Sequence, residues 1–222
     1  MIRLKDILLV EQSSKEFERV KLKYKFDSLE PSFDEETMKT HYNKHYKGYT
    51  DKLNEAIKEE NIPVVQGPGM ESIKTILANV SQYSDKLRNN AGGYFNHSLF
   101  FNNLMPESQG CHGELERLIN EQYGDCDTFI EQFSEAAKNK FGSGWCWLVY
   151  KNGQLKITTT TNQDNPAMNV VQDGGSILIA LDLWEHSYYL KYKNQRDKYI
   201  KAFWKVVCWS TAEERLQRVL NS

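Results

Sequence analysis

The sequence lacks the features that mark membrane-spanning chains and nucleic-acid-binding chains. No apolar run in its 222 residues approaches the roughly 18 residues that a membrane-spanning helix needs. Lysine and arginine number 28 against 30 aspartates and glutamates, so the formal net charge of -2 supplies no basic field for a nucleic-acid backbone. We therefore expect a globular protein that binds neither nucleic acid nor a membrane.

The N-terminus also lacks a targeting signal. Its apolar core is residues 7–10, which is too short for the apolar region of a secretory signal peptide. Glu11, Glu16 and Glu18 follow, whereas organelle transit peptides are poor in acidic residues. We treat residues 1–22 as a short extension and expect a cytoplasmic protein, with the mitochondrion as the alternative compartment.

Cysteine is sparse and has no recognisable spacing. None of the cysteines belongs to a C-x-x-C pair, and their spacing fits neither a zinc knuckle nor a disulfide scaffold; they are Cys111, Cys126, Cys146 and Cys208. We expect all of them to be reduced thiols in an intracellular protein.

The first half of the chain predicts helices alone. Acidic residues favour a helix start at Ser32 or Asp34, and Pro63 ends that helix. Gly92-Gly93 allows a close backbone approach or a break. The expected helices span residues 34–60, 70–88 and 94–104. A Pro- and Gly-containing stretch, residues 105–110, is the best candidate linker. His112 follows, and we expect a surface residue without a partner.

The second half predicts helices, then strands, then helices. Amphipathic helices are expected over 113–122 and 126–140, and helical segments again from 188 to 220. Strands are expected over 145–150, 155–161 and 176–183, the first two joined by the favoured hairpin turn Asn152-Gly153. Because the strands are clustered, the fold class is α+β. We expect an N-terminal helical hairpin domain, 23–107, and then an α/β domain with a small three-stranded antiparallel sheet, 108–222.

The sequence Asp-Leu-Trp-Glu-His at residues 182–186 is the centre of the functional argument. It places the carboxylate of Asp182 four residues from the imidazole of His186, after an apolar run that forms a rigid support. An oxygen and a nitrogen ligand suit a transition metal. This spacing alone is also consistent with a surface ion pair or a helix cap, so a metal site needs at least two more ligands.

Other histidines could supply those ligands. His41, His45 and Tyr49 follow one another at intervals of four residues, which places them on one helical face. His97 stands among aromatic and apolar residues. Each pattern alone also fits a hydrogen-bonded core residue, and spacing cannot prove that these residues meet.

At this point the chain resembles the iron/manganese superoxide dismutases, from about Tyr24 to its end. The resemblance is carried by four motifs in the family's order: His41-Tyr-Asn-Lys-His45 with Tyr49, Phe95-Asn-His97, Phe141-Gly-Ser-Gly-Trp-Cys-Trp147 and Asp182-Leu-Trp-Glu-His186-Ser-Tyr-Tyr189. The last is close to the family signature D-x-W-E-H-A-Y-Y.

The resemblance implies a role for each matching residue. The implied metal ligands are His41, His97, Asp182 and His186. His45 and Tyr49 match the family's pair at the substrate funnel. Glu185 and Tyr189 match residues that reach across the interface of a homodimer, which in some members assembles into a tetramer. Tryptophans match the aromatic shell around the metal; they are Trp145, Trp147 and Trp184.

The family also gives a way to predict the metal. A glutamine hydrogen-bonds the solvent ligand of the metal, and iron-type members usually supply it four residues before the second histidine ligand, where this chain has Gly93. Manganese-type members supply it from a loop after the hairpin, which Gln163 fits. We predict one manganese ion per chain with Gln163 as a catalytic residue, and iron as the alternative.

The implied activity is the conversion of superoxide to dioxygen and hydrogen peroxide by a metal that alternates between +3 and +2. Tyr49 and His45 would relay protons, and Lys44 and Arg196 are candidates for a local positive rim that attracts the anionic substrate. The chain departs from the family pattern at Tyr46, where a histidine is common, and at Asp197, where a proline is common. The first departure is expected to affect the mouth of the funnel or the substrate preference.

Three alternatives remain open from the sequence. The first is an iron-dependent dismutase. The second is a mononuclear non-haem oxygenase or hydrolase, although four protein ligands leave fewer open positions than a 2-His-1-carboxylate site. The third is a non-enzymatic metal-binding dimer. A peroxidative side activity is a further possibility that the sequence leaves open.

Overall fold

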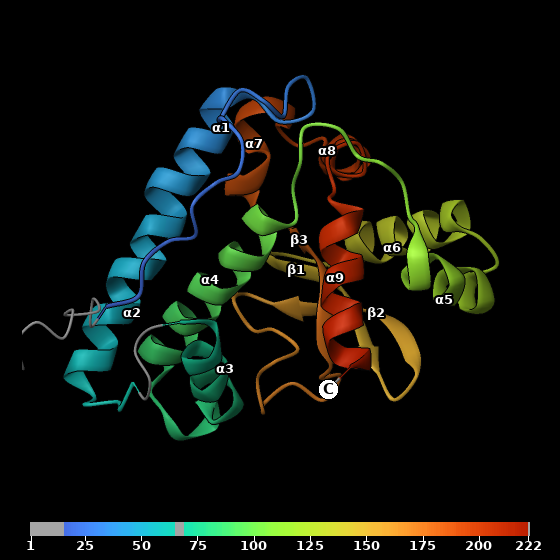
Figure 1. Ribbon diagram of the computed structural model, residues 1–222. Helices are drawn as coiled ribbons and strands as arrows, with labels where there is room; N and C mark the ends of the chain where they lie inside the picture. Colours follow the sequence, from blue (N-terminus) through green and yellow to red (C-terminus); the bar gives the residue numbers. More distant parts are fainter. Residues whose placement is uncertain (1–15, 65–68, 222) are drawn as a thin grey trace, which may run out of the picture.

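A computed structural model describes residues 16–64 and 69–221. It has the α+β architecture predicted from the sequence (Figure 1), with a helical N-terminal part followed by a part that contains a three-stranded antiparallel sheet. The N-terminal elements are α1 (Glu35–Thr40), the π-helix η2 (His41–Tyr46), α2 (Lys47–Glu59), α3 (Met70–Ala78), the 3-10 helix η3 (Val80–Gln82) and α4 (Asp85–Asn102).

The long helix α4 is the centre of the N-terminal part. It packs along α2 to form the predicted helical hairpin, and Figure 1 shows it between α2 and the C-terminal helix α9 (Trp209–Leu220). Every residue from Asn90 to Phe101 is buried. A helix that is buried on all sides can present different side chains to different neighbours, and α4 does so around the site described below.

The prediction of one helix over 70–88 is wrong, because α3, the short 3-10 helix η3 and the start of α4 occupy this range. α3 ends at Ala78, and Ser84 starts α4 by accepting a hydrogen bond from the backbone N–H of Leu87. Serine followed by an acidic residue is a strong helix start signal. Gly92-Gly93 lies inside α4 and does not break the helix. The two glycines instead allow Tyr49 and the loop of Gln163 to pack closely against the α4 backbone, which was the other predicted role.

The C-terminal part contains α5 (Gly113–Tyr123), α6 (Cys126–Asn139), β1 (Gly144–Lys151), β2 (Gln154–Thr161), β3 (Ser176–Asp182), the 3-10 helix η4 (Glu185–Ser187), α7 (Tyr189–Tyr192), α8 (Arg196–Phe203) and α9. The strand order is β2-β1-β3. Asn152 and Gly153 both have positive φ, as the predicted tight hairpin turn requires. The register places Trp145 of β1 opposite Asp182, the last residue of β3.

Helices cover the sheet and complete the core. α9 and α4 contact β3, whereas α6 contacts β1 and β2. The helical segments predicted from 188 to 220 are α7, α8 and α9; Lys193 adopts a positive φ after α7, and a turn separates α8 from α9. None of the helices in the described ranges is long and apolar enough to cross a membrane.

Two sequence predictions about the linker region are wrong. Cys111 and Cys126 form a disulfide, with their Cα atoms 6.7 Å apart, so only Cys146 and Cys208 are free thiols. The fold brings the end of the linker against the first residue of α6, which a search for C-x-x-C spacing does not detect. His112 is half-buried, and its Nε2 lies 3.5 Å from the hydroxyl of Ser210, so it has a partner.

Residues 1–15 of the predicted N-terminal extension lie outside the described residues. Within the rest of that extension, Phe17 is 3% exposed and packs edge-on against Tyr94 of α4. The backbone of Phe17 also exchanges hydrogen bonds with the Asn54 side chain of α2. Residues 16–22 therefore pack onto the helical hairpin.

Candidate metal centre

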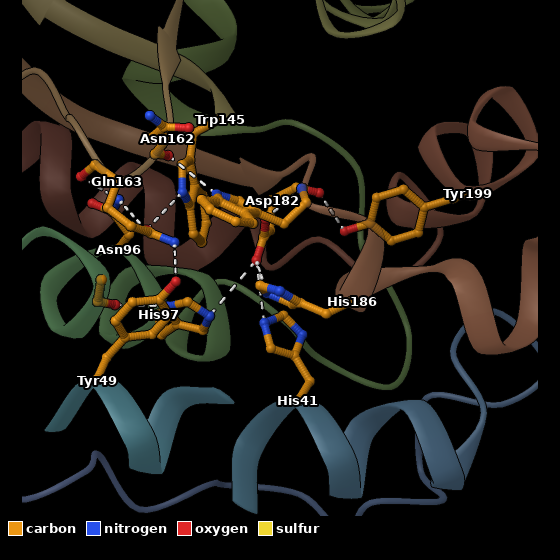
Figure 2. A network of polar contacts seen from close by, with 12 residues as sticks. His41, Tyr49, Asn96, His97, Trp145, Asn162, Gln163, Asp182, His186 and Tyr199 are labelled. Carbon is orange, nitrogen blue, oxygen red and sulfur yellow. Dashed lines mark hydrogen bonds and ion pairs between the residues drawn. The ribbon is translucent and has the colours of Figure 1, made fainter. Parts of the chain in front are cut away.

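Four side chains from both halves of the chain converge between the helical hairpin and the sheet (Figure 2). One ligand-type atom from each lies within 4.8 Å of the other three; the residues are His41, His97, Asp182 and His186. The Nε2 atoms of His41 and His186 are each 3.2 Å from Asp182 Oδ2, and that of His97 is 3.8 Å away. The structure thus brings together all four residues that the sequence singled out as ligands.

The sheet positions the carboxylate. Asp182 ends β3 and is fully buried. Its Oδ1 accepts the backbone N–H of Trp184 at 2.9 Å, and its carbonyl oxygen accepts the hydroxyl of Tyr199 at 2.8 Å. These bonds leave Oδ2 pointing toward the three imidazoles, as Figure 2 shows. The chain then turns through η4 and presents His186 to the same point.

The two fully buried imidazoles have the donor arrangement that a metal requires. The Nδ1 of His97 donates to the carbonyl oxygen of Gly93 at 2.6 Å, which leaves the lone pair on Nε2. The Nε2 atoms of His41 and His97 are buried and have no hydrogen-bond partner among the described residues. Buried nitrogen atoms without partners are costly unless something binds them. The residues present therefore fit a divalent or trivalent metal ion.

Burial and neighbouring charges set the protonation states of the same side chains. Burial lowers the pKa of His41 to about 4 and holds the pKa of His97 well below its usual range, so both imidazoles are neutral at pH 7. Burial by itself would raise the pKa of the Asp182 carboxyl, but His186 and His41 hold it well below the usual range. Together with His186 they offer three imidazole nitrogens and one carboxylate, the donor set that suits manganese or iron.

His41 stands on a π-helix. The sequence predicts an ordinary helix over 34–60, whereas residues 41–46 form the π-helical segment η2 between α1 and α2. π-helical turns are rare and are frequent at functional sites. This turn buries His41 and leaves His45 half-buried, with its ring stacked at 4.0 Å on that of His186. Helical periodicity alone contains no signal for such a turn.

Tyr46, where the family commonly has a histidine, lies behind His97. It is fully buried behind His97, with the two rings stacked at 5.7 Å, and does not lie at a funnel mouth. Its hydroxyl hydrogen-bonds the Ser98 hydroxyl at 2.6 Å and accepts the backbone N–H of Val20 at 3.1 Å. The departure from the usual histidine therefore lies against His97, one of the four converging side chains.

Gln163 and Tyr49 form a polar pair next to the four ligand-type side chains. Gln163 is 2% exposed, and its Nε2 donates to the Tyr49 hydroxyl at 2.9 Å. Its Oε1 accepts from Trp145 Nε1 at 3.1 Å and from Asn96 Nδ2 at 3.0 Å. Because both sides of the amide are bonded, its orientation is fixed (Figure 2). The sequence predicted Gln163 and Tyr49 but missed Asn96, although Asn96 directly precedes His97.

An ion pair anchors the loop that contains Gln163, and the sequence analysis missed it. Arg88 of α4 makes two hydrogen bonds with Asp164, Nε to Oδ1 at 2.8 Å and Nη2 to Oδ2 at 2.6 Å. The backbone oxygen of Asp164 also accepts from the Thr160 hydroxyl of β2. Two planar hydrogen bonds define both the direction and the distance of the loop from α4.

The residues predicted to serve substrate and partner lie toward the outside of the centre. Arg196 donates from Nη1 to the carbonyl oxygen of Lys140 at 2.8 Å, and its Nε and Nη2 are buried without a partner in the described ranges. A cavity of about 620 Å³ is lined by Arg196, Glu185 and His186, among others. Tyr189 is 48% exposed, and Lys44 is exposed.

Family comparisons match both halves of the chain. Residues 16–105 match the alpha-hairpin domain of iron/manganese superoxide dismutases, and residues 111–215 match the C-terminal domain of the same enzymes. The two matches meet at the linker and contain all four converging side chains, two in each half. The chain therefore belongs to the iron/manganese superoxide dismutases, which are oxidoreductases that act on superoxide.

Proposed function

We propose that this chain disproportionates superoxide with a single manganese ion held by His41, His97, Asp182 and His186. The observation that carries the proposal is the convergence of three imidazole nitrogens and one carboxylate oxygen within 4.8 Å, where the buried Nε2 atoms of His41 and His97 have no hydrogen-bond partner among the described residues. The bound metal would supply one-electron redox chemistry by alternating between the +3 and +2 states. Overall, two superoxide anions and two protons give dioxygen and hydrogen peroxide.

The chain's own residues would hold and deliver the protons. Burial raises the pKa of the Tyr49 hydroxyl, so that it stays protonated at neutral pH and can donate. Burial lowers the pKa of His45 to about 4, so its imidazole is neutral at pH 7, and it would relay a proton by taking one up at one ring nitrogen while it gives one up from the other. The Gln163 amide would hold Tyr49 toward the ligands through the 2.9 Å hydrogen bond.

Packing around Gly93 supports manganese over iron. A Cβ atom at Gly93 would lie 2.3 Å from the ring of Tyr49, so this position has no room for the glutamine that iron-type members carry there. Gln163 comes instead from the loop after the hairpin, as in manganese-type members. Iron is the alternative metal, because both ions accept the same nitrogen and oxygen ligands.

A homodimer is proposed to complete the site, with a tetramer as the alternative assembly. Glu185 and Tyr189 follow the last ligand-bearing turn and are the residues we propose for the interface. Tyr189 is 48% exposed, and Phe141, which lines the same cavity as Glu185, is 95% exposed; a second chain would bury this uncovered aromatic surface. Arg196 is proposed to attract superoxide at the cavity next to His186.

One variant set separates this proposal from an oxygenase and from a metal-storage dimer. Metal content and superoxide turnover would be measured for the wild type, Gln163→Ala and Asp182→Ala, with Gln132→Ala on the exposed face of α6 as the matched control. We expect Asp182→Ala to lose the metal and the activity, and Gln163→Ala to keep the metal but lose at least tenfold in rate. Full activity in Gln163→Ala would contradict the role of Gln163, and bound metal without turnover in the wild type would favour the alternatives.

A further inference from the structure

A second cavity lies on the side of α4 that faces away from the metal centre. Its volume is about 530 Å³, which is in the range of small-molecule sites. Its wall is formed by parts of α3, α4, β3 and α9, and Figure 1 shows these elements next to one another near the C-terminus. Phe95 and Leu99 of α4 line this cavity, whereas His97 between them faces the metal centre.

The wall is apolar over much of its area. Ile177 of β3, Val219 of α9 and Met70 of α3 line it together with Phe95 and Leu99. Met70 is 37% exposed, and Ile177 is only half-buried. These side chains leave apolar surface open to the cavity, where a ligand with an apolar body could cover it.

The polar part of the wall is predominantly cationic. Four positively charged side chains and one carboxylate line the cavity; they are Lys23, Lys74, Arg215, Arg218 and Glu214. Glu214 is already 3.7 Å from Arg218, and Lys74 pairs with Glu71. This local excess of positive charge contrasts with the net charge of -2 of the whole chain.

Arg215 is the most informative of these cations. Its Nη1 donates to the Asn103 side-chain oxygen at 2.7 Å and to the Leu178 carbonyl oxygen at 2.8 Å, and its Nη2 donates to the Leu99 carbonyl oxygen at 3.2 Å. No carboxylate pairs with it in the described part of the chain. Burial and the neighbouring Arg218 lower its pKa to about 10, although the charge of Glu214 acts in the opposite direction. The guanidinium thus lies in the cavity wall with hydrogen bonds to neutral oxygens and without a carboxylate in direct contact.

We propose that this cavity binds an amphiphilic monoanion, with a carboxylate head between the cations and an aliphatic body, of the size of a medium-chain fatty acid, along the apolar wall. The charge pattern selects the head, because a buried cation gains most from an anion that replaces its lost hydration. The wall formed by Met70, Ile177 and Val219 selects the body.

The test uses three probes with the same chain length and different heads. Binding of dodecanoate, dodecanol and dodecyltrimethylammonium to the metal-loaded full-length protein would be measured by isothermal titration calorimetry, below the concentration at which each probe aggregates. We expect one dodecanoate per chain, with at least tenfold weaker binding of the other two. Equal binding of all three probes, or no binding of dodecanoate, would overturn the proposal.

Matched variants locate the site. Lys23→Glu and Arg218→Glu are each expected to weaken dodecanoate binding by about tenfold, whereas Lys52→Glu on α2 and Arg117→Glu on α5 make the same charge changes outside the cavity and should leave it unchanged. Ala78→Trp fills the cavity from an exposed position at the end of α3, so it needs no change in the core and should abolish binding. Unchanged metal content and a single thermal transition establish that each variant is folded. Undiminished binding to Ala78→Trp would show that dodecanoate binds elsewhere.

Discussion

Replacing Gly93 by alanine tests how closely α4 packs against the ring of Tyr49 next to the metal centre. In an ordinary helix interior this change stabilises a protein by about 1 kcal/mol, because glycine is a poor helix former. At Gly93 the new Cβ would lie 2.3 to 2.7 Å from three carbon atoms of the Tyr49 ring. Real Cβ contacts essentially never fall below 3.0 Å, so the ring must move.

The size of the effect follows from three contributions. Overpacking costs about 1–3 kcal/mol, and a displaced Tyr49 loses its hydrogen bond from Gln163, which costs about 1 kcal/mol. Helix propensity offsets about 1 kcal/mol of this. We expect Gly93→Ala to destabilise the protein by about 1–3 kcal/mol and to lower the dismutase rate, because Tyr49 and Gln163 no longer meet.

Urea unfolding of the metal-free protein measures the stability, and superoxide turnover of the loaded protein measures the rate. Gly48→Ala is the matched control, since a Cβ there meets nothing within 4 Å and should stabilise α2 by about 0.5–1 kcal/mol. In a Tyr49→Ala background the cost of Gly93→Ala should disappear, because the two sites are coupled only through the ring. If Gly93→Ala stabilises the protein as Gly48→Ala does, the reasoning about this contact is refuted.

Three further changes give independent tests. Arg88→Ala should reduce superoxide turnover several-fold while lowering the free energy of unfolding by only about 1 kcal/mol, because the ion pair with Asp164 anchors the loop that contains Gln163 and is not part of the core. Unchanged turnover would show that this anchoring does not affect the reaction. Reduction of the Cys111–Cys126 disulfide, which closes a loop of sequence separation 15, should lower the free energy of unfolding by about 3 kcal/mol in urea titrations, and the double serine variant should not respond to the reductant. Burial lowers the pKa of His41 from 6.5 to about 4, so the unfolded metal-free chain binds more protons between these values. The free energy of unfolding should be constant above pH 6.5 and fall as the pH drops toward 4. A urea midpoint that rises as the pH is lowered from 6.5 to 4 would contradict a neutral His41 imidazole.

Short-range sequence patterns were sufficient to predict the β-hairpin and the fold class. The hairpin followed from β-branched and aromatic residues around Asn152-Gly153, and the fold class followed from the clustering of strands. The candidate ligands could be proposed because an aspartate and a histidine stand four residues apart at the end of an apolar strand. Their convergence with His41 and His97 came only from the resemblance, since no local signal brings residues so distant in sequence together.

The features that the sequence analysis missed are those set by tertiary contacts. The disulfide joins Cys111 to the first residue of α6 across the helix α5, and no spacing motif signals that contact. The π-helical turn at His41 keeps the same residue types as an α-helix and changes only the hydrogen-bond register. Ser84 offered a usable signal, because a serine followed by Asp85 is a helix start, and attention to it would have separated α3 from α4.

The central claim is a dismutase whose activity depends on one redox metal held by the converging side chains. Elemental analysis of the purified protein, with superoxide turnover before and after metal removal and after reloading with manganese or iron, tests it most directly. We predict about one manganese ion per chain and activity restored by manganese. Activity restored by iron alone would contradict the choice of metal and keep the dismutase. Bound metal without turnover under either ion would contradict the account itself.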